Sequence, residues 1–198
     1  MRSLEEEEFL GRIKRLTEEE FEKRREDLSL PLPSIFLPIF PRAVLDEATE
    51  AVFNRLGEEE KAIFDSVLFK PIVYSITLYF FAKKLIEEEI KEKKVYLVET
   101  VLLIGEQIVL LGIATGIAEK TESRLSREDL IGVMLGGIKM QRKIVTEAKE
   151  ILGRELAGEL LDFIDSSEEK LQQVVKKEGL QLKKSFFFTF WEKALQNL

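Results

Sequence analysis

Two glutamates in an apolar segment are the first candidates for chemistry in this sequence. Glu99 and Glu106 lie one heptad apart within residues 95–117, so a helix would place both carboxylates on the same face. Paired carboxylates can act as a general acid and base or bind a metal ion. Metal sites in helical bundles usually combine glutamates with Glu-x-x-His motifs, however, and the sequence contains no histidine. A structural role therefore has to be weighed against a chemical one.

Two basic residues farther along the chain offer that structural role. The segments on either side of residues 122–125 are predicted to form an antiparallel helical hairpin. The register that pairs Glu106 with Arg142 also pairs Glu99 with Lys149, so we expect two ion pairs between the helices. Close approach of the two backbones is predicted as well, with a ligand at the glycines as the alternative. The same register pairs Gly112 with Gly136 and Gly116 with Gly132.

The residue types that are missing exclude several classes of function. Without cysteine or histidine, the chain has no disulfide, no Cys/His zinc site, no thiol catalysis and no histidine-dependent triad. The glycine motifs that bind nucleotide phosphates are also absent. The acidic run 162–169 lacks the spacing of an EF-hand loop, and we interpret Ser166 and Glu169 as a helix cap. We expect no catalytic residue, no cofactor and no metal ion, and the sequence favours a protein that is not an enzyme.

Two apolar segments are the predicted contacts with a partner. Residues 30–41 contain four prolines, which predicts an extended conformation. Residues 170–198 contain six lysines and two glutamates, a net charge of +4, and end in a helix with aromatic residues on one face. Those aromatic residues could instead fill the core, or the helix could contact a membrane surface or single-stranded nucleic acid. The predicted partner-binding residues are Ile35, Phe36, Phe40, Phe186, Phe187, Phe190 and Trp191.

The elements that would position these residues are helices. The apolar spacing is helical along nearly the whole chain, whereas the alternation typical of strands is not sustained. We predict one all-α domain over residues 1–198, a bundle of six to eight helices around the hairpin of 95–121 and 127–152. The Pro-rich segment 30–41 is expected to lie against the bundle, and a basic aromatic helix to cover 182–197.

Local signals predict where individual helices begin and end. Ser126 and Asp129 have the spacing of a capping box, and Gly153 and Gly179 are predicted helix ends. Pro71 predicts a kink or break in its helix, or the first turn of a new one.

Composition also bears on location. Residues 95–117 are long enough to span a bilayer, but Glu106 at the centre would cost on the order of 3 kcal/mol, which argues against a membrane span. The acidic N-terminus has no apolar core of a secretory signal, so we expect a cytoplasmic protein. The net charge of −7 gives no strong indication of nucleic-acid binding. Scarce Asn and Met beside abundant Glu and Lys are typical of a thermophilic protein.

These features favour a helical interaction or scaffold protein that acts through homo- or hetero-oligomerisation. Apolar residues are plentiful for a small helical chain, and no catalytic constellation accompanies them. The alternative is a carrier or enzyme for an apolar small molecule or lipid bound between helices. In that case Glu99, Glu106 or Lys70 would provide the polar anchor.

Overall fold

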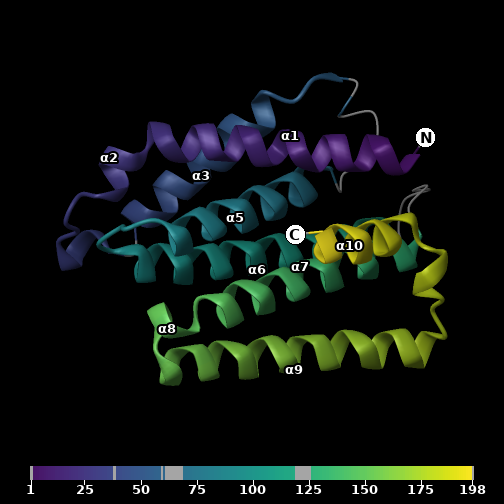
Figure 1. The fold of residues 1–198 in the computed structure, drawn as a ribbon. Coiled ribbons are helices and arrows are strands. Elements are labelled where there is room, and N and C mark those ends of the chain that lie inside the picture. Colours follow the sequence, from purple (N-terminus) through teal and green to yellow (C-terminus); the bar gives the residue numbers. More distant parts are fainter. Residues whose placement is uncertain (1, 38, 59, 61–68, 119–125, 198) are drawn as a thin grey trace.

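Helices and short connecting segments make up all the residues that the structure describes, and no strand is found among them (Figure 1). The computed structural model describes residues 2–37, 39–58, 60, 69–118 and 126–197, with the backbone alone for 2–5, 114–118, 186, 187 and 197. The predicted all-α class is confirmed. The helices are α1 (Arg2–Lys23), α2 (Arg25–Leu28), α3 (Phe40–Asn54), α5 (Phe69–Glu87), α6 (Lys93–Ala118), α7 (Arg127–Glu147), α8 (Lys149–Leu152), α9 (Arg154–Glu178) and α10 (Phe186–Asn197), with 3-10 turns η1 (Ser34–Phe36) and η2 (Leu182–Lys184).

The helices α5, α6 and α7 form the centre of the bundle (Figure 1). α1 and α3 pack against α5, whereas α9 and α10 pack against α7. The sequence of α5 has no continuous polar stripe, and residues such as Ile72, Ile76 and Tyr79 are completely buried. By contrast, α9 is amphipathic and lies at one edge of the molecule, with its principal contacts on α7 and α8 (Figure 1). One side of α9 therefore stays open.

The helices α6 and α7 are antiparallel neighbours, as the sequence predicts, but their register differs from the predicted one. Gln141 Nε2 of α7 donates a 2.8 Å hydrogen bond to the carbonyl of Val101 on α6, where the predicted register places Glu147. Nearer the turn, the Met134 side chain lies beside Gly112. Gly112 thus lies within one helical turn of its predicted position opposite Gly136, but the two glycines do not face each other, because Gly136 faces Trp191 of α10. Gly116 lies outside the residues with described surroundings.

Two of the α7 glycines instead make room for the C-terminal helix α10. A Cβ atom built on Gly136 would lie 2.6 Å from the Trp191 ring, and one on Gly132 would lie 3.1 Å from Cβ of Phe188. The Gly-x-x-x-Gly spacing does bring backbone and neighbour close together, but the neighbour is α10. Trp191 is 2 % exposed as a result and belongs to the core.

Several helix boundaries follow the local signals. The predicted capping box is confirmed, since Ser126 Oγ accepts from the Asp129 N–H and Asp129 accepts from the Ser126 N–H. Asp129 also accepts a 2.6 Å hydrogen bond from Ser185 Oγ, which holds the start of α10 against the start of α7. α9 ends at Gly179, whose φ of 65° is in the left-handed region.

Other local predictions are wrong, hold only in part or lie outside the described residues. Ser166 lies in the middle of α9 and caps nothing. The segment 30–41 is not extended throughout, because it contains η1 and the start of α3. It lies against the bundle only in part, since Leu32 and Phe40 pack against the core whereas Ile35 and Ile39 are 73 % and 65 % exposed. The described helix α5 begins at Phe69, so Pro71 lies in its first turn, in agreement with the second of the two alternatives for this residue, and no break follows it. Residues 61–68 and the turn 122–125 lie outside the described residues.

Candidate functional site

An apolar groove of about 550 Å³ runs between α6 and α9. It forms because α9 packs along α7 and leaves the outward side of α6 uncovered (Figure 1). We call it the α6–α9 groove. It is lined by Val101, Leu102, Gly105, Glu106, Ile108, Val109 and Leu110 of α6, Ile138 and Gln141 of α7, and Leu160, Phe163 and Ser167 of α9.

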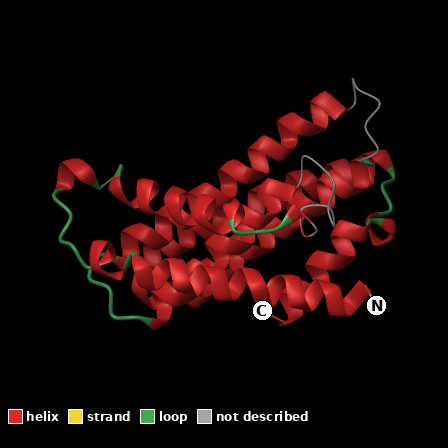
Figure 2. Ribbon diagram, turned by 90° about the horizontal axis from the view of Figure 1, so that it is seen from above, coloured by secondary structure: helices red, strands yellow, loops and turns green. Residues whose placement is uncertain are grey.

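Large apolar side chains in and beside this groove face solvent. The exposed fractions are 49 % for Leu102, 62 % for Val109, 52 % for Leu110, 57 % for Ile113 and 66 % for Phe163. Single exposed apolar residues are ordinary on a protein surface, but a cluster around a hollow is typical of an interaction site. The cluster reaches Ile113, and the backbone of α6 continues beyond it to Ala118, where the helix points away from the other helices in Figure 2.

The sequence of α6 explains why this surface is apolar. Within the described residues, its segment Lys93–Ile113 is the one helix long and apolar enough to cross a membrane by length and composition. The bundle buries only 39 % of that window. The helix α6 is apolar on all sides, but the bundle covers only some of them, so its remaining apolar side chains face solvent.

The polar groups of the groove are bonded to the protein itself. Gln141 is 3 % exposed, and its Nε2 is held by the carbonyl of Val101. The Ser167 hydroxyl donates to the carbonyl of Phe163 at 2.9 Å. Neither side chain is paired with a base or positioned as a nucleophile, so the groove offers an apolar surface for binding.

An acidic rim borders the groove along α3 and α6. Arg42 donates two hydrogen bonds to Glu106, both of 2.6 Å, and its Nε lies 3.6 Å from a carboxylate oxygen of Asp46. Glu99, one heptad before Glu106, receives no hydrogen bond from the residues that the structure describes. We call Arg42, Asp46, Glu99 and Glu106 the acidic rim, in which three carboxylates share one guanidinium.

The two glutamates of the rim have opposite pKa shifts. Hydrogen bonds from Arg42 lower the pKa of Glu106 below its ordinary value. Burial raises the pKa of Glu99, and the neighbouring Glu106 and Asp46 carboxylates raise it further, against the attraction of Arg42. Burial also raises the pKa of Asp46, although a side chain that is 54 % exposed keeps this effect small. The rim therefore carries more negative charge than Arg42 can balance.

The predicted ion pairs across the hairpin are wrong. Glu106 pairs with Arg42 of α3, and Arg142 pairs with Asp165 at 2.6 Å and Glu168 at 2.5 Å on α9. Glu106 therefore pairs with α3 and Arg142 with α9, and the two side chains do not pair with each other. Lys149 lies on α8, where its side chain is exposed, and Glu99 is left to the acidic rim.

The three predicted ligand anchors are not brought together. Glu106 lines the groove, and Glu99 lies two helical turns before it on the same face of α6. Lys70 is part of the contact between α3 and α5, where its Nζ lies 3.2 Å from Glu50 and 5.2 Å from the Phe53 ring centre. Lys70 therefore has a structural environment of its own.

The predicted partner-binding residues divide into exposed and buried ones. Ile35 and Phe36 are 73 % and 49 % exposed, whereas Phe40 packs partly against the core. Phe190 and Trp191 are each 2 % exposed and form no surface that a partner could contact. The side chains of Phe186 and Phe187 lie outside the described residues.

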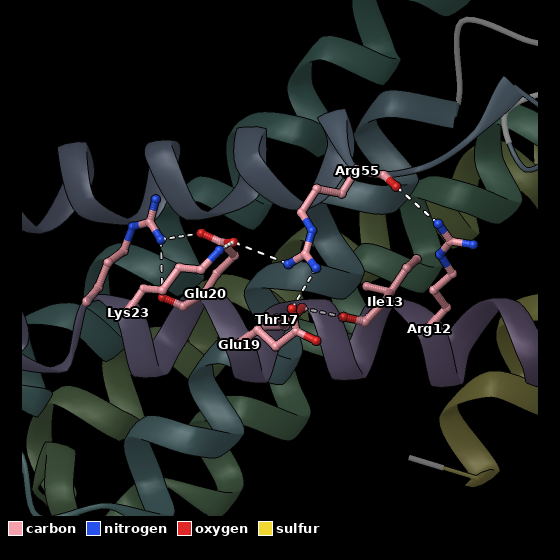
Figure 3. A network of polar contacts seen from close by, with 8 residues as sticks. Arg12, Ile13, Thr17, Glu19, Glu20, Lys23 and Arg55 are labelled. Atoms are coloured by element: carbon pink, nitrogen blue, oxygen red, sulfur yellow. Dashed lines mark hydrogen bonds and ion pairs between the residues drawn. The ribbon is translucent and has the colours of Figure 1, made fainter.

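Two other features of the molecule have a structural explanation. Figure 3 shows Arg55, the residue directly after α3, between Glu19 and Glu20 of α1, a closed network of charges at a helix contact. A smaller cleft of about 270 Å³ between α1 and α5 is lined by equal numbers of lysines and glutamates, so it has no preference in charge. Among the described residues, no group of acidic side chains is placed to hold a metal ion.

Sequence reasoning missed the role of α9. Phe163 and Leu160 form the far wall of the groove, and the sequence shows them only as members of an amphipathic stripe. One signal of this groove was available in the sequence, because the apolar residues of α6 point in all directions around the helix.

Comparison of the chain with family models, with curated proteins and with solved structures gave no match to any of them.

Proposed function

We propose that this protein is a non-enzymatic interaction protein that associates with a partner through the α6–α9 groove. The observation that carries the proposal is the cluster of Leu102, Val109, Leu110, Ile113 and Phe163, each about half exposed or more. Burial of such side chains provides the main driving force in most protein associations. The groove also contains no activated nucleophile among its described residues, which favours binding over catalysis.

The groove provides a wall and floor as well as an apolar surface. Phe163 lies on the opposite side from Val109, and Ile138 of α7 forms the base between them. An element placed there would be surrounded by apolar side chains on three sides. Interfaces draw most of their binding energy from anchors in such enclosed positions.

Crosslinking from inside the groove tests this proposal. The photoreactive amino acid benzoylphenylalanine would replace Phe163 in one variant and Glu169, an exposed residue of α9 outside the groove lining, in a matched control. After irradiation in cells, we expect discrete crosslinked protein species from position 163 and none from position 169. Equal or no crosslinking at the two positions would contradict the proposal.

The size of the groove supports a second candidate, the binding of an apolar small molecule or lipid. Its volume of about 550 Å³ lies within the ~300–1,000 Å³ typical of ligand sites, and most of its lining is apolar. Native mass spectrometry of the purified protein distinguishes this candidate. A co-purifying small molecule that is lost on Val109→Asp substitution would favour it, and protein without bound mass across several preparations would exclude it.

A further inference from the structure

We propose that the occupant of the α6–α9 groove is a basic amphipathic helix of another protein, seated with its apolar face in the groove and a cationic side chain at the acidic rim. This inference rests on the proposed function and specifies the partner. It depends on the shape of the groove, on the charge of its rim and on the exclusion of other occupants.

The exposed apolar residues follow α6 at helical spacing. Leu102, Val109 and Ile113 lie on one side of the helix and extend over about 16 Å of its axis. A partner helix presents apolar side chains at positions i, i+3 or i+4, and i+7, which cover a similar length. Phe163 on the opposite wall would close over that helix from α9.

The acidic rim selects the charge of the partner. Arg42 is already engaged by two hydrogen bonds to Glu106 and an ion pair with Asp46. Glu99 is partly buried and receives no hydrogen bond from the described part of the chain. A lysine or arginine at the flank of the docked helix would pair with Glu99 and reduce the repulsion among the three carboxylates.

The same charges disfavour a second copy of the chain. The protein carries a net charge of −7, so two copies repel each other at a distance. The aromatic C-terminal helix α10 is not free to dock either, because its apolar residues Phe190, Trp191 and Ala194 are buried in its own core. With one lysine and one glutamate, α10 also has no net basic charge to match the acidic rim. An anionic lipid surface would likewise be repelled by the acidic rim.

Two designed peptides provide the test. The first is a fluorescein-labelled amphipathic helix of leucine and lysine, and the second replaces each lysine by glutamate. Fluorescence anisotropy would measure the affinity of each for the intact protein. We expect the lysine peptide to bind at least about tenfold more tightly and to lose affinity as salt is added.

Three variants locate the binding. In Val109→Ser/Ile113→Ser the apolar anchors are removed, and we expect about tenfold weaker binding. In Asp46→Asn/Glu99→Gln two charges of the rim are removed, and binding of the lysine peptide alone should weaken by about fivefold. The control Glu150→Gln/Glu155→Gln removes two exposed charges from α8 and α9 and should change affinity by less than about twofold. Melting curves and Trp191 fluorescence would show that each variant is folded.

Each remaining outcome overturns a definite part of the argument. If both peptides require Val109 and Ile113 equally, the groove is a docking site but the basic partner is wrong. If the control pair weakens binding as much as the rim pair, the attraction is non-specific and the inference falls. If neither peptide depends on the groove, the proposed function fails as well. Light scattering that shows a dimer dissociated by Val109→Ser, or groove-dependent binding to phosphatidylcholine vesicles containing phosphatidylserine, would replace the proposed partner.

Discussion

The contact between α1 and α3 and the groove between α6 and α9 both bring charged groups beside apolar ones, but they do so in opposite ways. At the first contact, Glu20 has a side chain that is only 4 % exposed and accepts from Lys23 at 2.6 Å and Arg24 at 2.5 Å. Arg55, directly after α3, reaches the same carboxylate (Figure 3). In the groove, by contrast, apolar side chains are exposed and three carboxylates share the single guanidinium of Arg42.

The difference separates a contact that is complete from one that is not. At the α1–α3 contact, every charge of the network has a partner and the adjoining apolar residues, such as Ile13 and Val52, are fully buried. The interactions of that contact already contribute to the stability of the folded chain, so they are not available for binding a partner. In the groove, the apolar surface and the uncompensated charge of Glu99 can still contribute to binding.

The largest expected effect comes from breaking the closed network. Replacing Glu20 by Ala leaves Arg24 and Arg55 without their buried carboxylate and removes hydrogen bonds from both helices. We expect the free energy of unfolding to fall by about 3 kcal/mol. Urea denaturation followed by circular dichroism would measure it. A loss below about 1 kcal/mol would show that the network behaves like an ordinary surface ion pair.

A somewhat smaller loss in the free energy of unfolding is expected at the contact between α7 and α10. A methyl group added in Gly136→Ala would lie 2.6 Å from the Trp191 ring, so the indole has to move, at about 2 kcal/mol. The matched control is Gly158→Ala in α9, where no atom lies within 4 Å of the new Cβ. The control should stabilise the helix by up to about 1 kcal/mol. Thermal unfolding would confirm the prediction if the melting temperature of Gly136→Ala lies below that of the wild-type protein and the melting temperature of Gly158→Ala lies above it.

The fold class and many helix ends were predictable because they depend on local signals. The capping residues Ser126 and Asp129, and the terminal Gly179, act within a few residues of their own position. The register between α6 and α7 could not be predicted in the same way, because it depends on side chains of other helices, such as Trp191 of α10. Gly136 is a small residue in either register, and only the position of Trp191 shows which neighbour needs the space.

The candidate site was predictable in part for the same reason. Glu106 and Glu99 stand out in the sequence as acids in an apolar helix. Glu106 lines the groove, and Glu99 belongs to the acidic rim beside it. Their partner was not predictable, because α3 and α7 both offer an arginine, Arg42 and Arg142. Which arginine reaches Glu106 depends on how the bundle closes around α6, and no pattern of spacing encodes that choice.

Acidification should affect the two regions with opposite signs. Burial opposes ionisation of Glu20, but the hydrogen bonds from Lys23 and Arg24 outweigh it and lower its pKa below 4.5, the ordinary value of glutamate. Its stabilisation is present above pH 4.5 and is lost as the pH falls through the lowered pKa. Burial raises the pKa of Glu99, so the native protein takes up its proton first, and stability falls as the pH rises from 4.5 through the raised pKa.

Two variants separate these contributions. Glu20→Gln should be less stable than the wild-type protein near neutral pH, with a difference that shrinks below pH 4.5. Glu99→Gln should be slightly more stable near neutral pH, and this gain should also vanish below pH 4.5. Denaturation curves from about pH 3 to about pH 7 would measure both differences. If Glu99→Gln destabilises the protein at neutral pH, Glu99 has a partner within the fold and the rim is complete.

The smallest effect on stability is expected in the groove itself. Val109 and Ile113 are 62 % and 57 % exposed, so their replacement by Ser removes little apolar contact within the folded chain. We expect the free energy of unfolding to change by less than about 0.5 kcal/mol, whereas binding of the lysine peptide falls about tenfold. Leu111, which is 2 % exposed on the same helix, is the matched control, and Leu111→Ser should cost about 2 kcal/mol or more. A large loss of stability in the Val109 and Ile113 variants would mean that these side chains support the fold, and the contrast between a complete contact and an open one would no longer hold.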